Sequence, residues 1–245
     1  MTAVAPVFLT APAKLTLNLR ITGVLDNGYH LIDAEMVTVD LHDTLWLDPG
    51  GEGLVVRDGG VDLAADENNL VAKALSLTGR TAAITLTKRI PSQAGLGGGS
   101  ADAGAVLRWA GFTDLEKAAQ IGADVAFCTV GGRARVTGIG QLVEPLPFVA
   151  RDLTLFTPPV GCPTPVIYSR WDAMGGAEGD NGNDLEPAAI AAVPELARYR
   201  DHLGEISGQT PRLAGSGSTW FVEGHHAGEG LVLVKTVPAG WSAYY

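Results

Sequence analysis

The segment PSQAGLGGGSADAG, residues 91–104, concentrates glycine directly ahead of an alanine-rich stretch. Five of the ten residues from Gly95 to Gly104 are glycine, which costs backbone entropy in any ordered structure. Glycine also lets successive backbone N–H groups approach an anion, because no Cβ blocks the contact and positive φ angles are accessible. The segment therefore predicts a tight anion-binding turn.

A helix is predicted directly after this turn, over residues 100–110, with Gly111 at its end. Ser100 is the expected N-cap, and Asp102 is expected in the first turn. Helix N-termini attract negative charge, so we expect a triphosphate there, with the Ser100 hydroxyl near a phosphate or its Mg²⁺. The alternative is a surface loop before a capped helix, which glycine clusters form more often. The phosphate site is favoured because these glycines lie between a strand and a helix, outside any low-complexity sequence.

Two common phosphate-binding loops do not match this segment. The P-loop ends in Gly-Lys-Ser/Thr, whereas Gly99 precedes Ser100 here with no lysine. The dinucleotide fingerprint needs a third glycine at the sixth position, which is Ser100 when counted from Gly95. A nucleotide-dependent oxidoreductase is therefore disfavoured.

The composition indicates a folded protein that binds neither nucleic acid nor membrane. The 245 residues are 46% hydrophobic and 18% charged, enough for one large core or two modest ones. The formal net charge is −10, and no basic stripe suits a nucleic-acid backbone. We find no signal peptide and no apolar run of about eighteen residues. Cys128 and Cys162 lack disulfide-framework or metal-ligand spacing, which fits a cytoplasmic location.

Strand and helix patterns mix along the chain. Alternating apolar and polar residues over 14–21 predict a strand, and Asn27-Gly28 predicts a hairpin turn after it. Further strands are expected over 37–47, 82–90, 152–158, 211–224 and 230–238, with a hairpin over 131–146. Helices are expected over 66–79, 113–122, 164–174 and 187–203. Thr113 and Glu116 have capping-box spacing, and Pro194 should split the last helix. The pattern weakens between 145 and 151, so we predict an α+β fold in two parts that meet near residue 150.

Several motifs resemble a known family. The segment PSQAGLGGGSADAGAVL resembles the glycine-rich motif of the GHMP small-molecule kinases, named for galactokinase, homoserine kinase, mevalonate kinase and phosphomevalonate kinase. The segments APAKLTLNLRITGVLDNGYH and TPVIY resemble the branch that phosphorylates 4-diphosphocytidyl-2-C-methyl-D-erythritol. The segments GADVAFCTVGGRARVTGIGQ, NDLEP and RLAGSGSTWF follow in the order of that branch, so the likeness spans nearly the whole chain.

The resemblance implies a two-lobed α+β fold with the active site in the cleft between the lobes. Residues 1–150 would form the nucleotide-binding domain, and residues 151–245 would form the domain on the substrate side. The implied reaction transfers a phosphoryl group from ATP, with Mg²⁺, to the 2-hydroxyl of the cytidine diphosphate-linked sugar alcohol. This step belongs to the non-mevalonate route to isoprenoids, and we expect a monomer or weak homodimer.

The resemblance also implies a catalytic pair. Lys14 and Asp124 match the family's lysine and aspartate beside the attacking hydroxyl. Asp124 would accept the proton, while Lys14 would keep Asp124 ionised and offset charge on the transferred group. Taken singly, Lys14 fits a solvated strand face and Asp124 fits a helix cap. Their joint occurrence at family positions favours catalysis.

Tyr29 and Tyr168 match the family's aromatic residues around the cytosine ring, and His30 would bond the base edge. The plainer interpretations are turn residues for Tyr29 and His30, and core packing for Tyr168. Thr16 stands where the family commonly has asparagine and keeps a hydroxyl on the same strand face. Thr164 and Gly215 complete the expected substrate site, although Gly215 equally suits an ordinary tight turn.

The expected ATP site combines the glycine-rich turn with two residues that equally suit a plain surface. It consists of Asn69, Lys88, Pro91, Ala94, Gly95, Leu96, Gly97, Gly98, Gly99, Ser100 and Ala101. Two other functions compete with the cytidyl-substrate kinase. A kinase for homoserine or mevalonate would leave Tyr29, His30 and Tyr168 unexplained, and a binding protein without activity would leave Lys14 and Asp124 unexplained.

Overall fold

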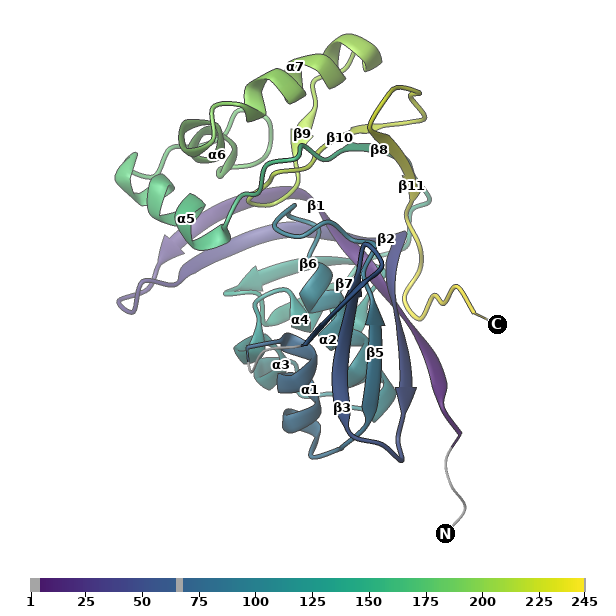
Figure 1. Cartoon of the computed structure of the whole chain (residues 1–245). Coiled ribbons are helices and arrows are strands. Elements are labelled where there is room, and N and C mark those ends of the chain that lie inside the picture. The colour runs from purple at the N-terminus through teal and green to yellow at the C-terminus, as the bar shows by residue number, and fades with distance from the viewer. Residues whose placement is uncertain (1–4, 65–67, 245) are drawn as a thin grey trace.

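A long antiparallel hairpin forms the frame of the molecule (Figure 1). The computed structural model describes residues 5–64 and 68–244, so residues 66 and 67 of the first expected helix lie outside it. Strands β1 (Val7–Val24) and β2 (His30–Asp48) pair with each other on either side of the predicted turn. The separate strands expected over 37–47 are therefore part of one strand. Gly28 in this turn has a φ of 83°, a left-handed conformation that glycine adopts at little steric cost.

This hairpin belongs to a seven-stranded sheet of order β4-β3-β5-β2-β6-β7, with β1 paired to β2. Its other strands are β3 (Gly53–Asp58), β4 (Val61–Ala64), β5 (Ala83–Thr87), β6 (Arg133–Gly138) and β7 (Leu142–Pro145). The helices beside it are α1 (Leu70–Thr78), α2 (Gly98–Ala110), α3 (Leu115–Ile121) and α4 (Val125–Val130), gathered together in the lower part of Figure 1. Strands β3 and β4, which pair beside β5 at the sheet edge, were not predicted from the sequence.

Helix α2 packs its alanine-rich side against β1 and against α4. A Cβ on Gly104 would lie 2.7 Å from the Cys128 carbonyl oxygen, so only glycine permits this close approach. The helix begins two residues earlier than predicted, and its N-cap is Gly97 rather than Ser100. Asp102 accordingly lies beyond the first turn. In α3 the cap is Asp114, whose carboxylate accepts the Lys117 N–H, so the predicted capping box is also wrong.

The rest of the chain forms the upper part of Figure 1. Its four-stranded sheet has the order β11-β8-β10-β9. The strands are β8 (Asp152–Phe156), β9 (Arg212–Leu213), β10 (Trp220–Glu223) and β11 (Leu231–Lys235). The helices are α5 (Thr164–Ala173), α6 (Glu186–Ala192) and α7 (Leu196–Ser207), and Pro194 separates the last two as predicted. The division into domains 1–150 and 151–245 stays a prediction.

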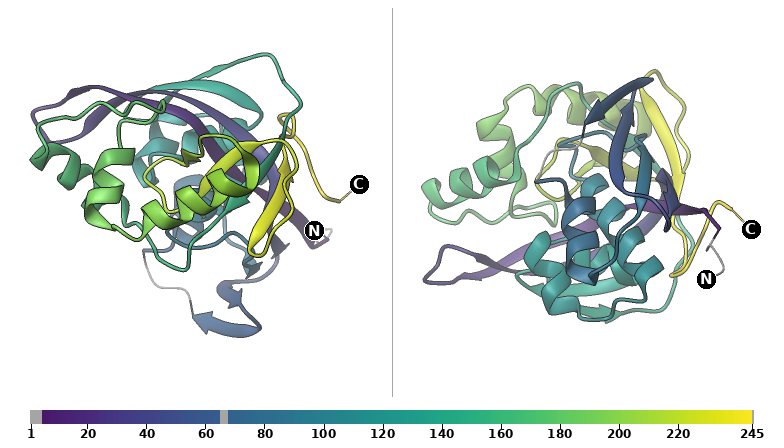
Figure 2. Two further views of the ribbon diagram at one scale, coloured as in Figure 1. Left: turned by 90° about the horizontal axis from the view of Figure 1, so that it is seen from above. Right: turned by 60° about the horizontal axis from the view of Figure 1, so that its bottom comes forward.

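The two parts are joined along β1. The Leu19 N–H donates to the Gly182 carbonyl at 2.9 Å, and the Asp184 N–H donates to the Leu19 carbonyl at 3.0 Å. The buried Asp184 carboxylate accepts from Arg20 Nη1 at 2.5 Å and from the Ile21 N–H at 2.8 Å. These bonds hold α5 and α6 over the hairpin, whose tip extends outward in both views of Figure 2.

Candidate active site

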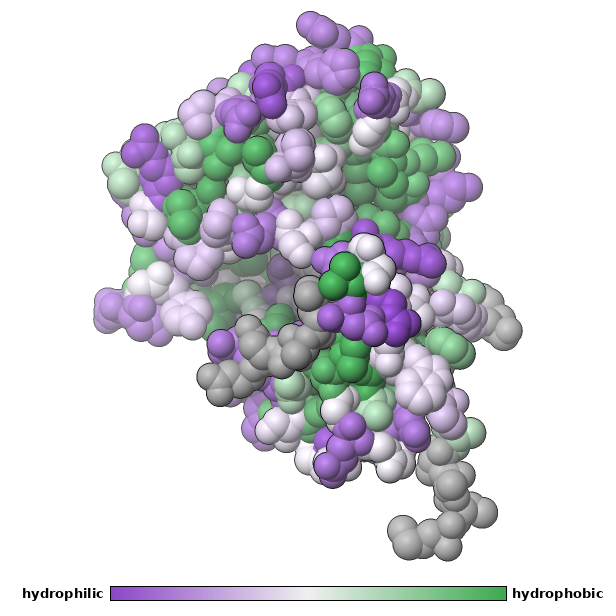
Figure 3. Space-filling view, in the orientation of Figure 1, coloured by the Kyte–Doolittle hydropathy of each residue, from purple (hydrophilic) through white to green (hydrophobic). Residues whose placement is uncertain are grey.

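A cavity of about 800 Å³ lies between the two parts. Figure 3 shows the corresponding hollow between the upper and lower parts of one face. Its walls come from the glycine-rich turn, the hairpin tip, the start of α5 and the turn at Gly215 and Ser216. Of the predicted site residues, sixteen line it: Lys14, Thr16, Tyr29, His30, Lys88, Pro91, Ala94, Gly95, Gly97, Gly98, Gly99, Ser100, Asp124, Thr164, Tyr168 and Gly215.

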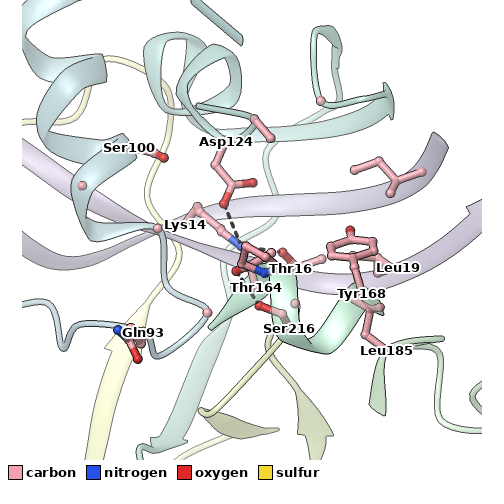
Figure 4. Close-up of a pocket in the computed structure, with 18 of the residues that line it drawn as sticks. Lys14, Thr16, Leu19, Gln93, Ser100, Asp124, Thr164, Tyr168, Leu185 and Ser216 are labelled. Carbon is pink, nitrogen blue, oxygen red and sulfur yellow. Dashed lines mark hydrogen bonds and ion pairs between the residues drawn. The ribbon is translucent and has the colours of Figure 1, made fainter. Parts of the chain in front are cut away.

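Lys14 is buried, with only 6% of its side chain exposed. The pairing between β1 and β2 is interrupted between Pro12 and Lys14, and the Lys14 N–H donates instead to the Leu96 carbonyl at 3.1 Å. Its Nζ donates to Thr16 Oγ1 at 3.1 Å and lies 3.3 Å from Asp124 Oδ2, as Figure 4 shows. This burial contradicts the solvated-strand interpretation of Lys14.

Asp124 lies at the N-cap position of α4, but within the described chain its carboxylate makes no capping hydrogen bond. The carboxylate faces Lys14 instead and is 30% exposed. A carboxylate that is paired with one buried cation and open to a cavity is free to accept a proton from a bound hydroxyl. The cap interpretation of the Asp124 side chain is therefore wrong.

Two glycine turns pack against each other beside this pair. An added Cβ on Gly95, where φ is 75°, would lie 2.1 Å from the Ala214 carbonyl oxygen. On Gly97 it would lie 2.7 Å from Lys14 Cγ, and on Gly215 it would lie 3.3 Å from Lys14 Nζ. These three glycines make room for protein atoms, so they hold Lys14 in place as well as leaving backbone exposed.

The N-terminus of α2 opens on the cavity. Gly98, Gly99 and Ser100 line it, and they are the first residues of a 13-residue helix. The N–H groups of a first helical turn have no partner inside the helix, and the dipole adds positive potential. Because Ser100 does not cap the helix, its hydroxyl is available at the same place. Figure 4 shows Ser100 at the start of α2.

Lys88 lines the cavity, but its ammonium is bound by two carboxylates. It donates to Asp102 Oδ2 at 2.7 Å and to Asp43, which is fully buried. Burial alone would lower the pKa of Lys88, yet Asp102 and Asp43 raise it. Burial, more than the charge of Asp43, raises the pKa of Asp102, whose Oδ1 is buried without a partner in the described chain. Lys88 thus ties the start of α2 to the end of β5.

Three predicted ATP-site residues do not line the cavity. The Leu96 and Ala101 side chains are fully buried in the core instead. The Asn69 side chain caps α1 by accepting the Val71 N–H at 2.9 Å.

The far end of the cavity carries aromatic side chains. Tyr29 lies at the hairpin tip and is 59% exposed. The His30 ring packs on Tyr168, with 4.6 Å between ring centroids, and its Nε2 lies 2.8 Å from Asp172 Oδ1. Burial, and secondly the charge of Asp124, raises the pKa of Tyr168. This end offers one open ring at Tyr29 and one fixed imidazole.

Gln93 and Asp172 also line the cavity and were not predicted from the sequence, and Ser216 lines it from the second glycine turn. Ser216 hydrogen-bonds the Thr164 hydroxyl at 3.0 Å, and its place between two glycines was a usable signal. Gln93 has a positive φ of 53°, and nothing in a glutamine side chain indicates such a backbone conformation from the sequence. Asp172 has no local signal, because its partner is 142 residues away.

Sequence relatives decide the family. A relative from Paracoccus denitrificans, named 4-diphosphocytidyl-2-C-methyl-D-erythritol kinase, is 37% identical over 86% of this chain and 84% of its own length. A relative of the same name from Ruegeria pomeroyi is 35% identical over 96% of both chains. The chain belongs to the 4-diphosphocytidyl-2-C-methyl-D-erythritol kinase family. It is therefore a small-molecule kinase, as predicted.

Membership in this kinase family agrees with the fold. Residues 68–132 match the GHMP kinases N terminal domain. A solved structure of 4-(cytidine 5'-diphospho)-2C-methyl-D-erythritol kinase is 27% identical, with a TM-score of 0.74 over 94% of this chain and 99% of that one. A mevalonate kinase structure, 12% identical with a TM-score of 0.59, shares the fold alone. The two-lobed GHMP kinase fold predicted from the sequence is confirmed. Among the described helices, none is long and apolar enough to span a membrane.

Proposed function

We propose that this kinase transfers the γ-phosphoryl group of ATP to the 2-hydroxyl of 4-diphosphocytidyl-2-C-methyl-D-erythritol, a step in making isoprenoid precursors. The observation that carries the proposal is the 3.3 Å pair of Lys14 and Asp124 at the wall of a cavity. An anion-attracting helix start lies at one end of this cavity, and aromatic rings lie at the other. The cytoplasmic location and the monomer or weak homodimer remain part of the proposal.

In the proposed reaction the triphosphate lies at the N-terminus of α2, where the backbone N–H groups of Gly98, Gly99 and Ser100 donate to it. Asp124 takes the proton of the acceptor hydroxyl as that oxygen attacks the γ-phosphorus, while the bond from the γ-phosphorus to the β–γ bridging oxygen breaks and ADP leaves. The Lys14 ammonium, which Thr16 helps to orient, keeps Asp124 ionised and offsets charge on the transferred group. The turns of Gly95 and Gly215 fix this geometry.

Mg²⁺ would enter with the nucleotide. Among the described residues, no three histidine, cysteine, aspartate or glutamate side chains are grouped to hold a metal ion. The Ser100 hydroxyl would hold the ion together with phosphate oxygens and water, which suits an ion that keeps several waters. When bound, the ion neutralises charge on the phosphates.

The cytosine ring would lie at the far end, stacked between Tyr29 and Tyr168 with its edge on His30. The GHMP kinases of homoserine and mevalonate act on alcohols that carry no base, so they need no such rings.

The test is an ADP-release assay with the purified protein, ATP and Mg²⁺. We expect turnover with 4-diphosphocytidyl-2-C-methyl-D-erythritol and none above background with homoserine or mevalonate. Turnover of homoserine or mevalonate with no reaction of the cytidyl compound would overturn the proposal in favour of another alcohol kinase.

A further inference from the structure

The His30 side chain is held on three sides although it lies in the wall of a cavity. It is 9% exposed, with the Tyr168 ring 4.6 Å away at 40° and the Trp171 ring 5.5 Å away at 81°. The Trp171 Nε1–H donates to the Ala177 carbonyl at 2.8 Å, so Trp171 is itself fixed. Contacts of this kind leave an imidazole one orientation.

Asp172 determines which ring nitrogen of His30 carries the hydrogen. Its Oδ1 lies 2.8 Å from Nε2, and its side chain is 48% exposed. An ionised carboxylate only accepts hydrogen bonds, so this contact requires the hydrogen on Nε2. In the uncharged ring, Nδ1 then carries a lone pair and is an acceptor.

The Nδ1 atom of His30 is available to accept a hydrogen bond from a ligand. Within residues 5–64 and 68–244 the His30 Nδ1 atom makes no hydrogen bond, and it is not fully buried. It is therefore open to solvent, on a residue that lines the cavity.

We propose that Asp172 is a specificity-determining residue that, by fixing the hydrogen of His30 on Nε2, makes the site select a pyrimidine with an amino group at position 4. Cytosine offers that amino group as a donor to Nδ1. Uracil offers a carbonyl oxygen there, which would face the Nδ1 lone pair with no hydrogen between them. Asp172 acts through His30 and is a positioning residue, and the inference rests on the proposed function.

The experiment compares CDP and UDP as competitive inhibitors of the wild-type enzyme and of Asp172→Ala. We expect the wild type to bind CDP at least tenfold more tightly than UDP, roughly the effect of one unmatched polar pair. In Asp172→Ala this preference should fall about tenfold, since His30 can then carry its hydrogen on either nitrogen, while the KM for ATP stays unchanged. Asp201→Ala, which removes another exposed aspartate from a helix of the same part, is the matched control.

A second measurement distinguishes a role of Asp172 in base selection from a purely structural role. Nitrogen-15 chemical shifts of the uncharged His30 ring should show the hydrogen on Nε2 in the wild type and on both nitrogens in Asp172→Ala. An unchanged CDP preference in Asp172→Ala, or a wild-type hydrogen on Nδ1, would overturn the inference. Turnover of the cytidyl substrate by the wild type would leave the proposed function standing in either case, whereas its absence would remove the function itself.

Discussion

The two ends of the cavity are built in opposite ways. At the proposed phosphoryl-transfer end, the 6%-exposed Lys14 lies on β1 between two glycine turns, where an added Cβ would come within 2.1–3.3 Å of protein atoms. At the proposed cytidine end, Tyr29 is 59% exposed at a hairpin tip and Asp172 is 48% exposed on α5.

This difference follows from what each end has to do. A buried charge is tolerated only when its partners are fixed, because an unpaired one costs several kcal/mol. The transfer end is therefore stabilised from every side, and changes there should affect turnover, stability or both. Base recognition adds contacts of modest energy, so changes at the exposed residues of that end, Tyr29 and Asp172, should affect affinity alone.

The largest expected effect is on turnover, from Asp124→Asn. Losing the proton acceptor should lower kcat by roughly 10²–10⁴-fold, because an amide cannot take the hydroxyl proton. ADP release under saturating substrates measures it. Calorimetric ATP binding close to the wild-type value, with a similar melting temperature, would exclude a folding effect. Full activity in this variant would show that Asp124 is not the base. The proposed difference between the two ends of the cavity would then lose its main support.

The next effect is on stability, from Gly95→Ala. The new Cβ would lie 2.1 Å from the Ala214 carbonyl oxygen at a positive φ, so we expect a loss of at least ~2 kcal/mol in the free energy of unfolding. Gly99→Ala is the matched control, since its Cβ would meet only Leu70 Cδ1 at 3.6 Å inside a helix. Urea unfolding of both variants measures the difference, and equal stabilities would show that the two turns do not pack as described.

Stability at the transfer end should also depend on pH. Burial raises the pKa of Asp102 to about 8, above its ordinary value near 3.8. The folded state therefore binds a proton that the unfolded state lacks between these values. The free energy of unfolding should fall as pH rises from about 4 to about 8, by at most ~1.4 kcal/mol per pH unit for one group. Urea unfolding across this range should show a shallower fall of the unfolding free energy with pH in Asp102→Asn than in the wild type. An identical slope would contradict the raised pKa of Asp102.

The smallest effect is expected at the cytidine end, from Tyr29→Ala. Losing one stacking partner should raise the KM for the cytidyl substrate by roughly 2–10-fold, with the KM for ATP and the melting temperature unchanged. Tyr168→Ala should raise it further, because Tyr168 also packs against His30. Steady-state kinetics with each substrate varied separately measures both. Substrate affinity that is unchanged in both variants would refute the stacking.

Much of the fold was predictable because its signals are local. The alternation over 14–21 and the Asn27-Gly28 turn anticipated the β1–β2 hairpin, and Pro194 separated α6 from α7. The errors arose where two local signals compete. Ser100 has a capping side chain, but the left-handed Gly97 starts the helix instead.

The sequence by itself determined most of the elements and their order, the glycine-rich turn before α2 and, through resemblance, the kinase family. The same resemblance predicted the pair of Lys14 and Asp124. Only the tertiary structure decided that Lys88 meets Asp43 and Asp102 and that His30 meets Asp172. Turns and caps depend on neighbours a few residues away, so a sequence displays them. Partners up to 142 residues apart are chosen by the packing of whole strands and helices, which no short pattern records.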